Sequence, residues 1–214
     1  MPLVVSHHLR PVRYGQFAQY VTTSGPRRVN LARELTRQSM TEYTPLTDHY
    51  GALRRAVVDG TVKECLPERL DLAVRNASGS RASTYPRLAA NYQCWYDQMG
   101  LAGATVQKIG ARTWPDTGVV RVNPLFAVHY PDRRPGMLVT VHWKAARLAG
   151  EAVTAMLRLV QLAYPDWPDM VPVLLDVQRG DHHEPVGQDA DYDEWLRSEA
   201  ASLAVLLARF ADTA

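Results

Sequence analysis

His142 and Lys144 lie two residues apart in the segment VTVHWK, and together they offer an amine that can face a phosphate and an imidazole that can serve as a ligand. Because side chains alternate along a strand, Thr140, His142 and Lys144 are expected to share one face. The chain has 21 arginines and 3 lysines, so arginine is its usual cation. A lysine at this position therefore indicates a role for a compact, titratable amine. The alternatives are a surface lysine at a strand end and an ordinary hydrogen-bonded histidine.

The preceding segment, GVVRVNPLFAVHY, predicts a second strand that folds back through the turn PDRRPG. If Tyr130 pairs near Met137, Asn123 lies about opposite Lys144. The face opposite the apolar one would then carry a polar cluster of Arg121, Asn123, His142 and Lys144. Pro124 interrupts this strand, which indicates an edge strand or a bulge.

Asp176 lies near the end of the nearly continuous apolar run VPVLLDV, which is typical of a strand buried on both faces. Open α/β sheets often bind ligands at the carboxyl ends of such strands. Asp176 could therefore act with His142 and Lys144 in catalysis if the protein is an enzyme. The alternative is that Asp176 caps the turn that follows it.

Four arginines between residues 27 and 37 could contact phosphates, namely Arg27, Arg28, Arg33 and Arg37. Residues 1–84 hold 12 Lys and Arg against 7 Asp and Glu, whereas residues 85–214 hold 12 against 15. A positive N-terminal half could meet an anionic partner such as DNA or RNA. A solvated helix face explains the same arginines.

No cofactor or metal is expected from the motifs. The run Gly180–Asp181–His182–His183–Glu184 offers metal-capable groups, but adjacent residues rarely point at one ion. The two cysteines form no metal-like cluster, and the chain has no P-loop, G-x-G-x-x-G, G-x-S-x-G or H-E-x-x-H motif.

The spacing of apolar residues predicts an α+β fold with a helical N-terminal half. Helices are expected over about 13–22, 25–40, 48–60 and 67–76, and a flexible linker over 77–84. From Pro86 the predicted order is helix, three strands, helix, strand and a last helix from about residue 189. We therefore expect a helical region at 1–84 and a small mixed sheet with helices at 85–214, which could also pack as one unit.

This order resembles the core of the PD-(D/E)xK nuclease superfamily, over roughly residues 86–180. In that family an acid on the second core strand and the D/E of the third hold magnesium, and the lysine helps to position or activate water. Lys144 matches the lysine, His142 stands in place of the D/E, and Asn123 stands roughly where the other acid belongs. The resemblance implies a restriction-endonuclease-like core that has lost its activity, or one that uses Mg²⁺ or Mn²⁺ through another arrangement.

The whole chain also resembles a bacterial family of uncharacterised proteins. The shared segments are F-x-x-Y-V-x-x-S-G-x-x-R (Phe17, Tyr20, Val21, Ser24, Gly25, Arg28), Y-x-P-x-x-D-x-Y (Tyr43, Pro45, Asp48, Tyr50) and V-N-P followed by a lysine-ended strand (Val122, Asn123, Pro124, Lys144). Leu125 departs from this pattern, because an acidic residue is expected after V-N-P. The resemblance brings no activity with it.

Three hypotheses follow for function. The first is a nucleic-acid-binding protein on a degenerate, inactive nuclease-like core. The second is an interaction or scaffold protein, or a self-associating subunit of a larger assembly, with interface residues among Trp95, Trp167 and Trp195. The third is a metal-dependent nuclease with a non-standard site. A cytoplasmic protein without membrane contact is expected, because the chain has no signal-peptide pattern and no apolar run of about 18 residues.

Overall fold

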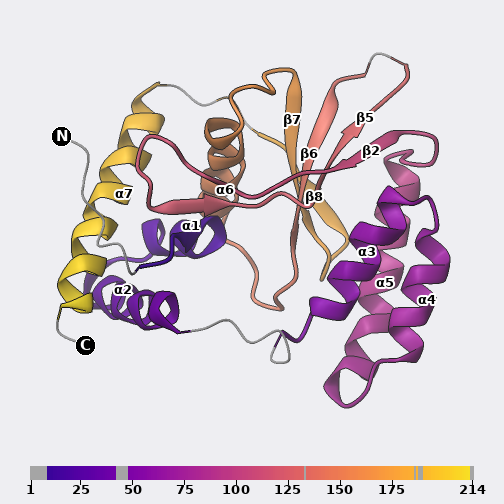
Figure 1. The fold of residues 1–214 in the computed structure, drawn as a ribbon, viewed down its shortest axis with the longest axis horizontal. Coiled ribbons are helices and arrows are strands. Elements are labelled where there is room, and N and C mark those ends of the chain that lie inside the picture. The colour runs from indigo at the N-terminus through magenta and orange to yellow at the C-terminus, as the bar shows by residue number, and fades with distance from the viewer. Residues whose placement is uncertain (1–8, 42–47, 133, 186, 188–189, 213–214) are drawn as a thin grey trace.

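The computed structural model describes residues 9–41, 48–132, 134–185, 187 and 190–212, and the expected mixture of helices and strands is confirmed. Figure 1 shows three layers, with a central sheet between two groups of helices. The helices are α1 (Tyr14–Val21), α2 (Gly25–Met40), α3 (Gly51–Val62), α4 (Leu66–Arg75), α5 (Ser80–Gln98), α6 (Gly150–Ala163) and α7 (Ala190–Ala211). The strands are β1 (Val12–Arg13), β2 (Thr105–Lys108), β3 (Arg112–Thr113), β4 (Val120–Val122), β5 (Phe126–His129), β6 (Gly136–His142), β7 (Met170–Asp176) and β8 (Asp181–His183).

The larger sheet has the strand order β2-β5-β6-β7-β8. β6 and β7 are parallel and are joined through α6, whereas the other neighbours are antiparallel. A helical crossover is the usual way to connect two parallel strands. The predicted parallel strand at the run VPVLLDV is therefore confirmed, and its register pairs His142 with Asp176.

Pro124 divides the segment that was expected to form one long strand. β4 leaves the larger sheet and joins β1 and β3 in a three-stranded sheet, while β5 pairs with β6. The expected pairing of Tyr130 near Met137 was wrong by two residues, because Val128 is the partner of Met137. Since proline has no backbone N–H for the ladder, the chain can change sheets at this point.

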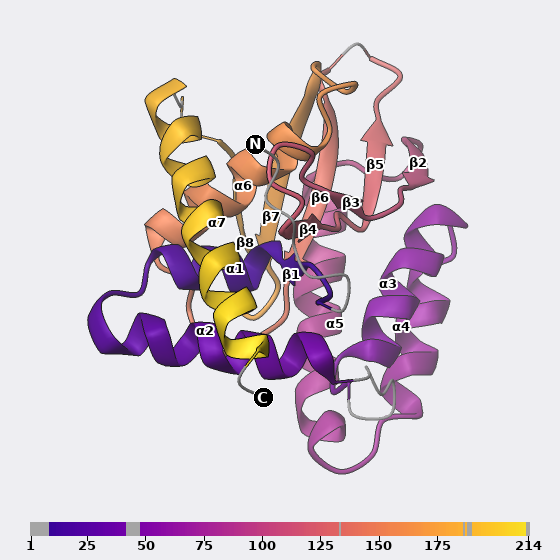
Figure 2. The same ribbon diagram turned by 60° about the vertical axis from the view of Figure 1, so that its left-hand side comes forward.

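The two faces of the larger sheet carry different helices (Figures 1 and 2). Ala127, Leu138 and Leu174 lie in a hydrophobic cluster with α1, α6 and α7, and α2 packs on α7. Phe126 and Val139 lie in a second cluster with α3, α4 and α5. The N-terminal helices therefore contribute to both clusters, and a boundary between residues 84 and 85 stays a prediction.

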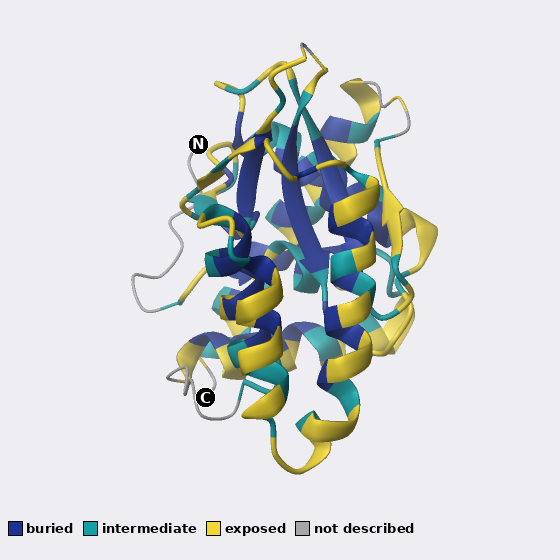
Figure 3. Ribbon diagram, turned by 90° about the vertical axis from the view of Figure 1, so that its right-hand side faces the viewer, coloured by how far each residue is buried: buried dark blue, intermediate teal, exposed yellow. Residues whose placement is uncertain are grey.

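α5 begins at Ser80, six residues before the expected start at Pro86, so five of the eight residues of the expected linker at 77–84 are helical. Pro86 is exposed inside the helix, and large buried side chains hold this helix against the sheet (Tyr85, Leu88, Tyr92 and Trp95). Figure 3 shows the resulting pattern, with exposed outer faces on the helices and buried strands behind them. Burial of this face outweighs the local cost of the proline.

We expect Gly136→Ala to lower the free energy of unfolding by about 1 kcal/mol, because it overfills a packed site. A Cβ at Gly136 would lie 2.7 Å from the carbonyl oxygen of Val128 and would also meet the side chain of Met170. Urea denaturation followed by circular dichroism measures the change. Gly150→Ala is the matched control, since a Cβ there meets nothing within 4 Å. Equal stability of the two variants would contradict the prediction.

Candidate functional site at the ends of β6 and β7

The polar residues at the carboxyl ends of β6 and β7 form a group that we call the strand-end cluster, which consists of His142, Lys144, Asp176, Gln178 and Arg179. His142 and Asp176 are partners in the parallel ladder, so their side chains leave the same face of the sheet. Lys144 is exposed in the bend after β6 rather than on the strand. The structure thus brings three of the predicted site residues to one edge.

Asp176 is held tightly within this cluster. It is 4% exposed, and its carboxylate accepts hydrogen bonds from Arg179 Nη1 at 2.7 Å and from the backbone N–H of Gln178 at 3.1 Å. Arg179 Nη2 also donates to the carbonyl of Ala145 at 3.0 Å. Asp176 therefore caps the turn that follows β7, which is the alternative that the sequence analysis left open. The same contacts hold the Arg179 side chain between the ends of β6 and β7.

His142 is half-buried, and its Nε2 lies 2.8 Å from the carbonyl oxygen of Ala146. Because a carbonyl oxygen only accepts, Nε2 must carry the hydrogen of this bond. One step inward on the same face, Thr140 interacts with the Tyr14 hydroxyl. Burial raises the pKa of Tyr14 to about 12, so this phenol stays protonated and closes the inner side of the site.

α5 contributes two residues that the sequence interpretation missed. Arg87 donates to the Gln178 side-chain oxygen at 2.6 Å, and Asn91 donates to the Val177 carbonyl at 2.9 Å. Gln178 in turn donates to the Trp143 carbonyl at 2.6 Å. The signal in the sequence was an Arg and an Asn four residues apart, which share a helix face. Their partners, 86 to 91 residues away, could not be identified without the fold.

Four exposed cations lie around this edge, and we call them the basic edge: Arg87, Lys144, Arg147 and Arg179. Arg87 and Arg179 are tied to the β7 turn, whereas Lys144 and Arg147 belong to the segment between β6 and α6. Arg147 was also missed, because it lies in a segment with no regular pattern. The basic edge thus combines two fixed guanidinium groups with two cations on a connecting segment.

Asn123 and Arg121 do not lie together on one strand with His142. Asn123 is exposed between β4 and β5, three residues before Phe126, whose partner Val139 is three residues before His142. It therefore lies toward the same edge of the sheet. Arg121 belongs to β4 in the smaller sheet, where its charge acts on Tyr164.

The four arginines of α2 do not form a single surface. Arg28 pairs with Glu199 of α7 and lies 4.2 Å from the ring centre of Tyr20, and Arg33 lies 4.9 Å from that of Phe210. Arg27 and Arg37 instead line a groove of about 430 Å³ beside α1. Arg27 and Arg28 are consecutive and so point to different sides of the helix, whereas Arg33 and Arg37 are four residues apart and lie next to each other on its surface. Arg28 and Arg33 therefore pack on α7.

The donor groups at the strand-end cluster do not fit magnesium or manganese. Mg²⁺ prefers several oxygen ligands, and the single carboxylate of the cluster, on Asp176, is already bound by Arg179. Within the described residues, no three His, Cys, Asp or Glu side chains gather in a way that could hold a metal ion.

The tryptophans proposed as interface residues differ in exposure. Trp95 is 1% exposed and packs 5.6 Å from the ring of Tyr92, so it belongs to the core. Trp195, on α7, is 37% exposed. Trp167 is half-buried, 5.9 Å from the ring of His129. Only Trp167 and Trp195 remain available to a partner.

Two further observations bear on the expected class of protein. Within the described ranges, no helix is long and apolar enough to cross a membrane.

Tyr43 and Pro45, which carried part of the resemblance to a bacterial family, lie outside the described residues, as does the expected start of the last helix at Asp189. No family model, no curated protein and no solved structure matches this chain.

Proposed function

We propose that this protein binds nucleic acid through the basic edge and does not cleave it. The observation that carries the proposal is that the segments bearing Arg87, Lys144, Arg147 and Arg179 meet at the carboxyl ends of two parallel strands. Guanidinium and ammonium groups on one face are the usual contacts of proteins with phosphate backbones. The ends of parallel strands are also a common place for ligands in sheets of this kind.

The order of elements supports the proposal. From α5 onward the larger sheet is built as helix, three antiparallel strands, helix and parallel strand, through α5, β2, β5, β6, α6 and β7. This is the order that suggests a restriction-endonuclease-like core. β3 and β4 are inserted between the first two of these strands, and β8 is added at the edge. The argument from topology is one of analogy, so the basic edge has to carry the functional claim.

The charges at the edge favour an anionic ligand. Two acidic groups lie at this end of the sheet: Asp176 is buried and paired with Arg179, and its ladder partner Asp181 is exposed on β8. The four cations of the basic edge outnumber these two carboxylates, so Lys144 and Arg147 add a net positive charge to this surface. Contacts of this kind release counterions from the nucleic acid, so binding should weaken steeply as salt is added.

Cleavage is not part of the proposal, because the chemistry needs two carboxylates that hold a metal between them. Asn123 and His142 occupy the places where the resemblance requires acids, and Asp176 is bound to Arg179. An assay of labelled DNA and RNA with Mg²⁺ and Mn²⁺ tests the remaining alternative, a nuclease that uses His142, Lys144 and Asp176. If the chain cleaves nucleic acid and Lys144→Ala abolishes the cleavage, the nuclease hypothesis replaces the present proposal.

The variant Lys144→Ala/Arg147→Ala is expected to weaken binding about tenfold near 0.1 M salt and to reduce the slope of log K against log salt by about 2. Fluorescence anisotropy with labelled single- and double-stranded DNA and RNA across a salt series measures both quantities. Lys63→Ala/Arg69→Ala removes the same charge from two exposed positions, one directly after α3 and one on α4, and is the matched control.

The control variant should bind like the original chain. An equal loss in the two variants would show that net charge alone matters and would remove the basic edge from the proposal. If the original chain does not bind at low salt, the nucleic-acid function is excluded and a protein partner becomes the leading hypothesis.

A further inference from the structure

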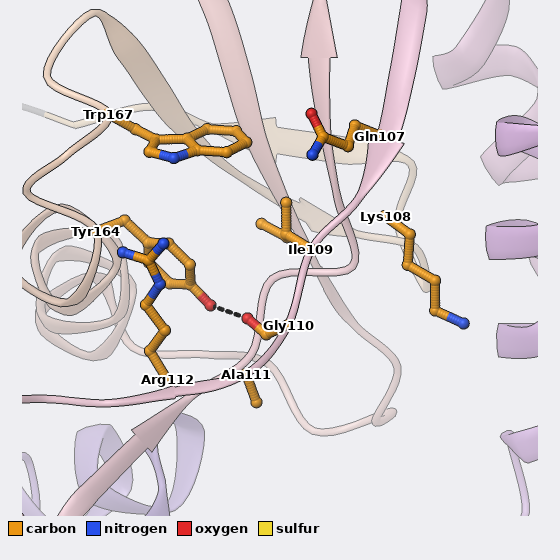
Figure 4. A pocket seen from close by; sticks show the side chains of 8 residues that line it. All are labelled: Gln107, Lys108, Ile109, Gly110, Ala111, Arg112, Tyr164 and Trp167. Atoms are coloured by element: carbon orange, nitrogen blue, oxygen red, sulfur yellow. Dashed lines mark hydrogen bonds between the residues drawn. The ribbon is translucent and has the colours of Figure 1, made fainter.

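A second site candidate lies away from the basic edge, between the segment 107–112 and the end of α6 (Figure 4). It is a pocket of about 340 Å³, which we call the Trp167 pocket, and its walls include Gln107, Ile109, Arg112, Tyr164 and Trp167. This volume is at the lower end of the range for small-molecule sites. It suits one planar ring with a small substituent rather than a dinucleotide.

The floor of the pocket is fixed by polar contacts. The Tyr164 hydroxyl donates to the carbonyl of Gly110 at 2.5 Å, and burial raises the pKa of this phenol, so it stays a donor. Arg112 lies 4.5 Å from the centre of the Tyr164 ring and pairs with Asp166. The hydrogen bond between Arg112 and Asp166 lowers the pKa of Asp166, so the pair stays ionised at neutral pH and holds the guanidinium over the ring.

Opposite this floor stands the indole of Trp167, and Figure 4 shows open space between it and the pair of Tyr164 and Arg112. Flat aromatic and guanidinium surfaces are the groups on which nucleobases stack. Ile109 closes the far side of the space with an apolar group. The walls therefore favour a flat, partly apolar ligand.

The amide of Gln107 lies beside the Trp167 indole in Figure 4. Gln107 is exposed, so its amide is accessible to a ligand. An amide offers a donor and an acceptor side by side, and this matches the edge of a nucleobase. Lys108 points away from the open space, so the pocket is built for a ring more than for a phosphate.

We propose that the Trp167 pocket binds a single nucleobase, which stacks on Trp167 and meets the amide of Gln107 with its hydrogen-bonding edge. The base can come from a free nucleoside or nucleotide, or from an unstacked position in a single strand. The inference goes beyond binding at the basic edge and rests on different residues. An uncharged nucleoside tests it separately, because phosphate contacts play no part in its binding.

The experiment is a calorimetric titration of the full chain with adenosine, guanosine, cytidine and uridine, with their 5′-monophosphates, and with short single-stranded oligonucleotides. At least one nucleoside is expected to bind with a Kd of about 1 mM or tighter. Trp167→Ala should weaken this binding about fivefold or more, whereas Trp167→Phe keeps a stacking surface and should retain most of it. Gln107→Ala should weaken the preferred base most.

Trp195→Ala, on α7, is the matched control and should bind like the original chain. Circular dichroism shows whether each variant is folded. If Trp167→Ala is not folded, the loss of binding expected for Gln107→Ala, at an exposed position, decides the test. If an oligonucleotide binds more tightly than the monophosphate and this difference is lost in Trp167→Ala, the ligand is a base within a single strand. Equal binding of the two assigns it to a free nucleotide.

No heat of binding with any of the four nucleosides up to about 5 mM overturns the proposal. Unchanged binding in Trp167→Ala also overturns it. Neither result affects the basic edge, which is tested with duplexes and with variants of Lys144 and Arg147. Loss of duplex binding leaves nucleoside binding at the Trp167 pocket intact.

Discussion

Trp114→Ala is expected to lower the free energy of unfolding by about 3–5 kcal/mol, the usual cost of removing a large aromatic side chain from a core. Trp114 is 0% exposed and directly follows β3. It lies in the hydrophobic cluster with Val12 and Val120, which join the small sheet to α6 and α7. Its loss would therefore open a cavity where the two sheets and the helices meet. Chemical denaturation followed by circular dichroism measures the effect.

Trp114→Phe separates volume from polarity at the same position. The indole Nε1 of Trp114 is buried, and no described residue accepts a hydrogen bond from it. An unpaired buried N–H costs about 1–3 kcal/mol, so removing it offsets part of the lost packing. We expect the phenylalanine variant to lose much less stability than the alanine variant. Equal losses would contradict the assigned role of the indole N–H, and an unchanged alanine variant would contradict the cavity argument.

The elements that the sequence predicted well are those with a strong local period. The run VPVLLDV is apolar except for Asp176 because β7 is covered on both faces, and it forms the inner parallel strand. α6 carries its apolar stripe at helical spacing and packs on β7. In both segments the burial pattern is set by near neighbours in the chain, so a single sequence contains the signal.

The candidate site was harder to predict, because its geometry depends on distant partners. The step from β4 to β5 at Pro124 moved Arg121 into another sheet, and a strand-by-strand interpretation cannot see which sheet a strand joins. Arg87 and Asn91 reach the β7 turn only because α5 lies against the sheet. The shift of two residues in the β5–β6 register likewise followed from the turn, whose conformation the residues alone do not determine.

The second large effect is expected from Asp193→Asn, which should lower the free energy of unfolding by about 2–3 kcal/mol at pH 7. Arg158 of α6 donates two hydrogen bonds of 2.6 Å to the two oxygens of Asp193 in α7. The side chains are 23% and 11% exposed, so the variant would leave a largely buried guanidinium without its counter-charge. Urea denaturation at several pH values measures both the loss and its pH dependence.

The hydrogen bond from Arg158 lowers the pKa of Asp193 in the folded chain. A carboxyl whose folded pKa is depressed stabilises the fold above its unfolded pKa of about 4, and this contribution is lost as the pH falls through the folded pKa. The difference between the original chain and Asp193→Asn should therefore be constant from about pH 5 upward and should shrink below about pH 4.

Asp132→Asn provides the matched control for this pH dependence. Arg134 also lowers the pKa of Asp132, but both side chains are more than half exposed, at 54% and 53%. Water screens such a pair, so the control variant should change stability little at any pH. A similar loss in the two variants would mean that the contact between α6 and α7 does not depend on the buried pair. A loss in Asp193→Asn that persists undiminished at pH 2 would assign it to packing rather than to the charge of the carboxylate.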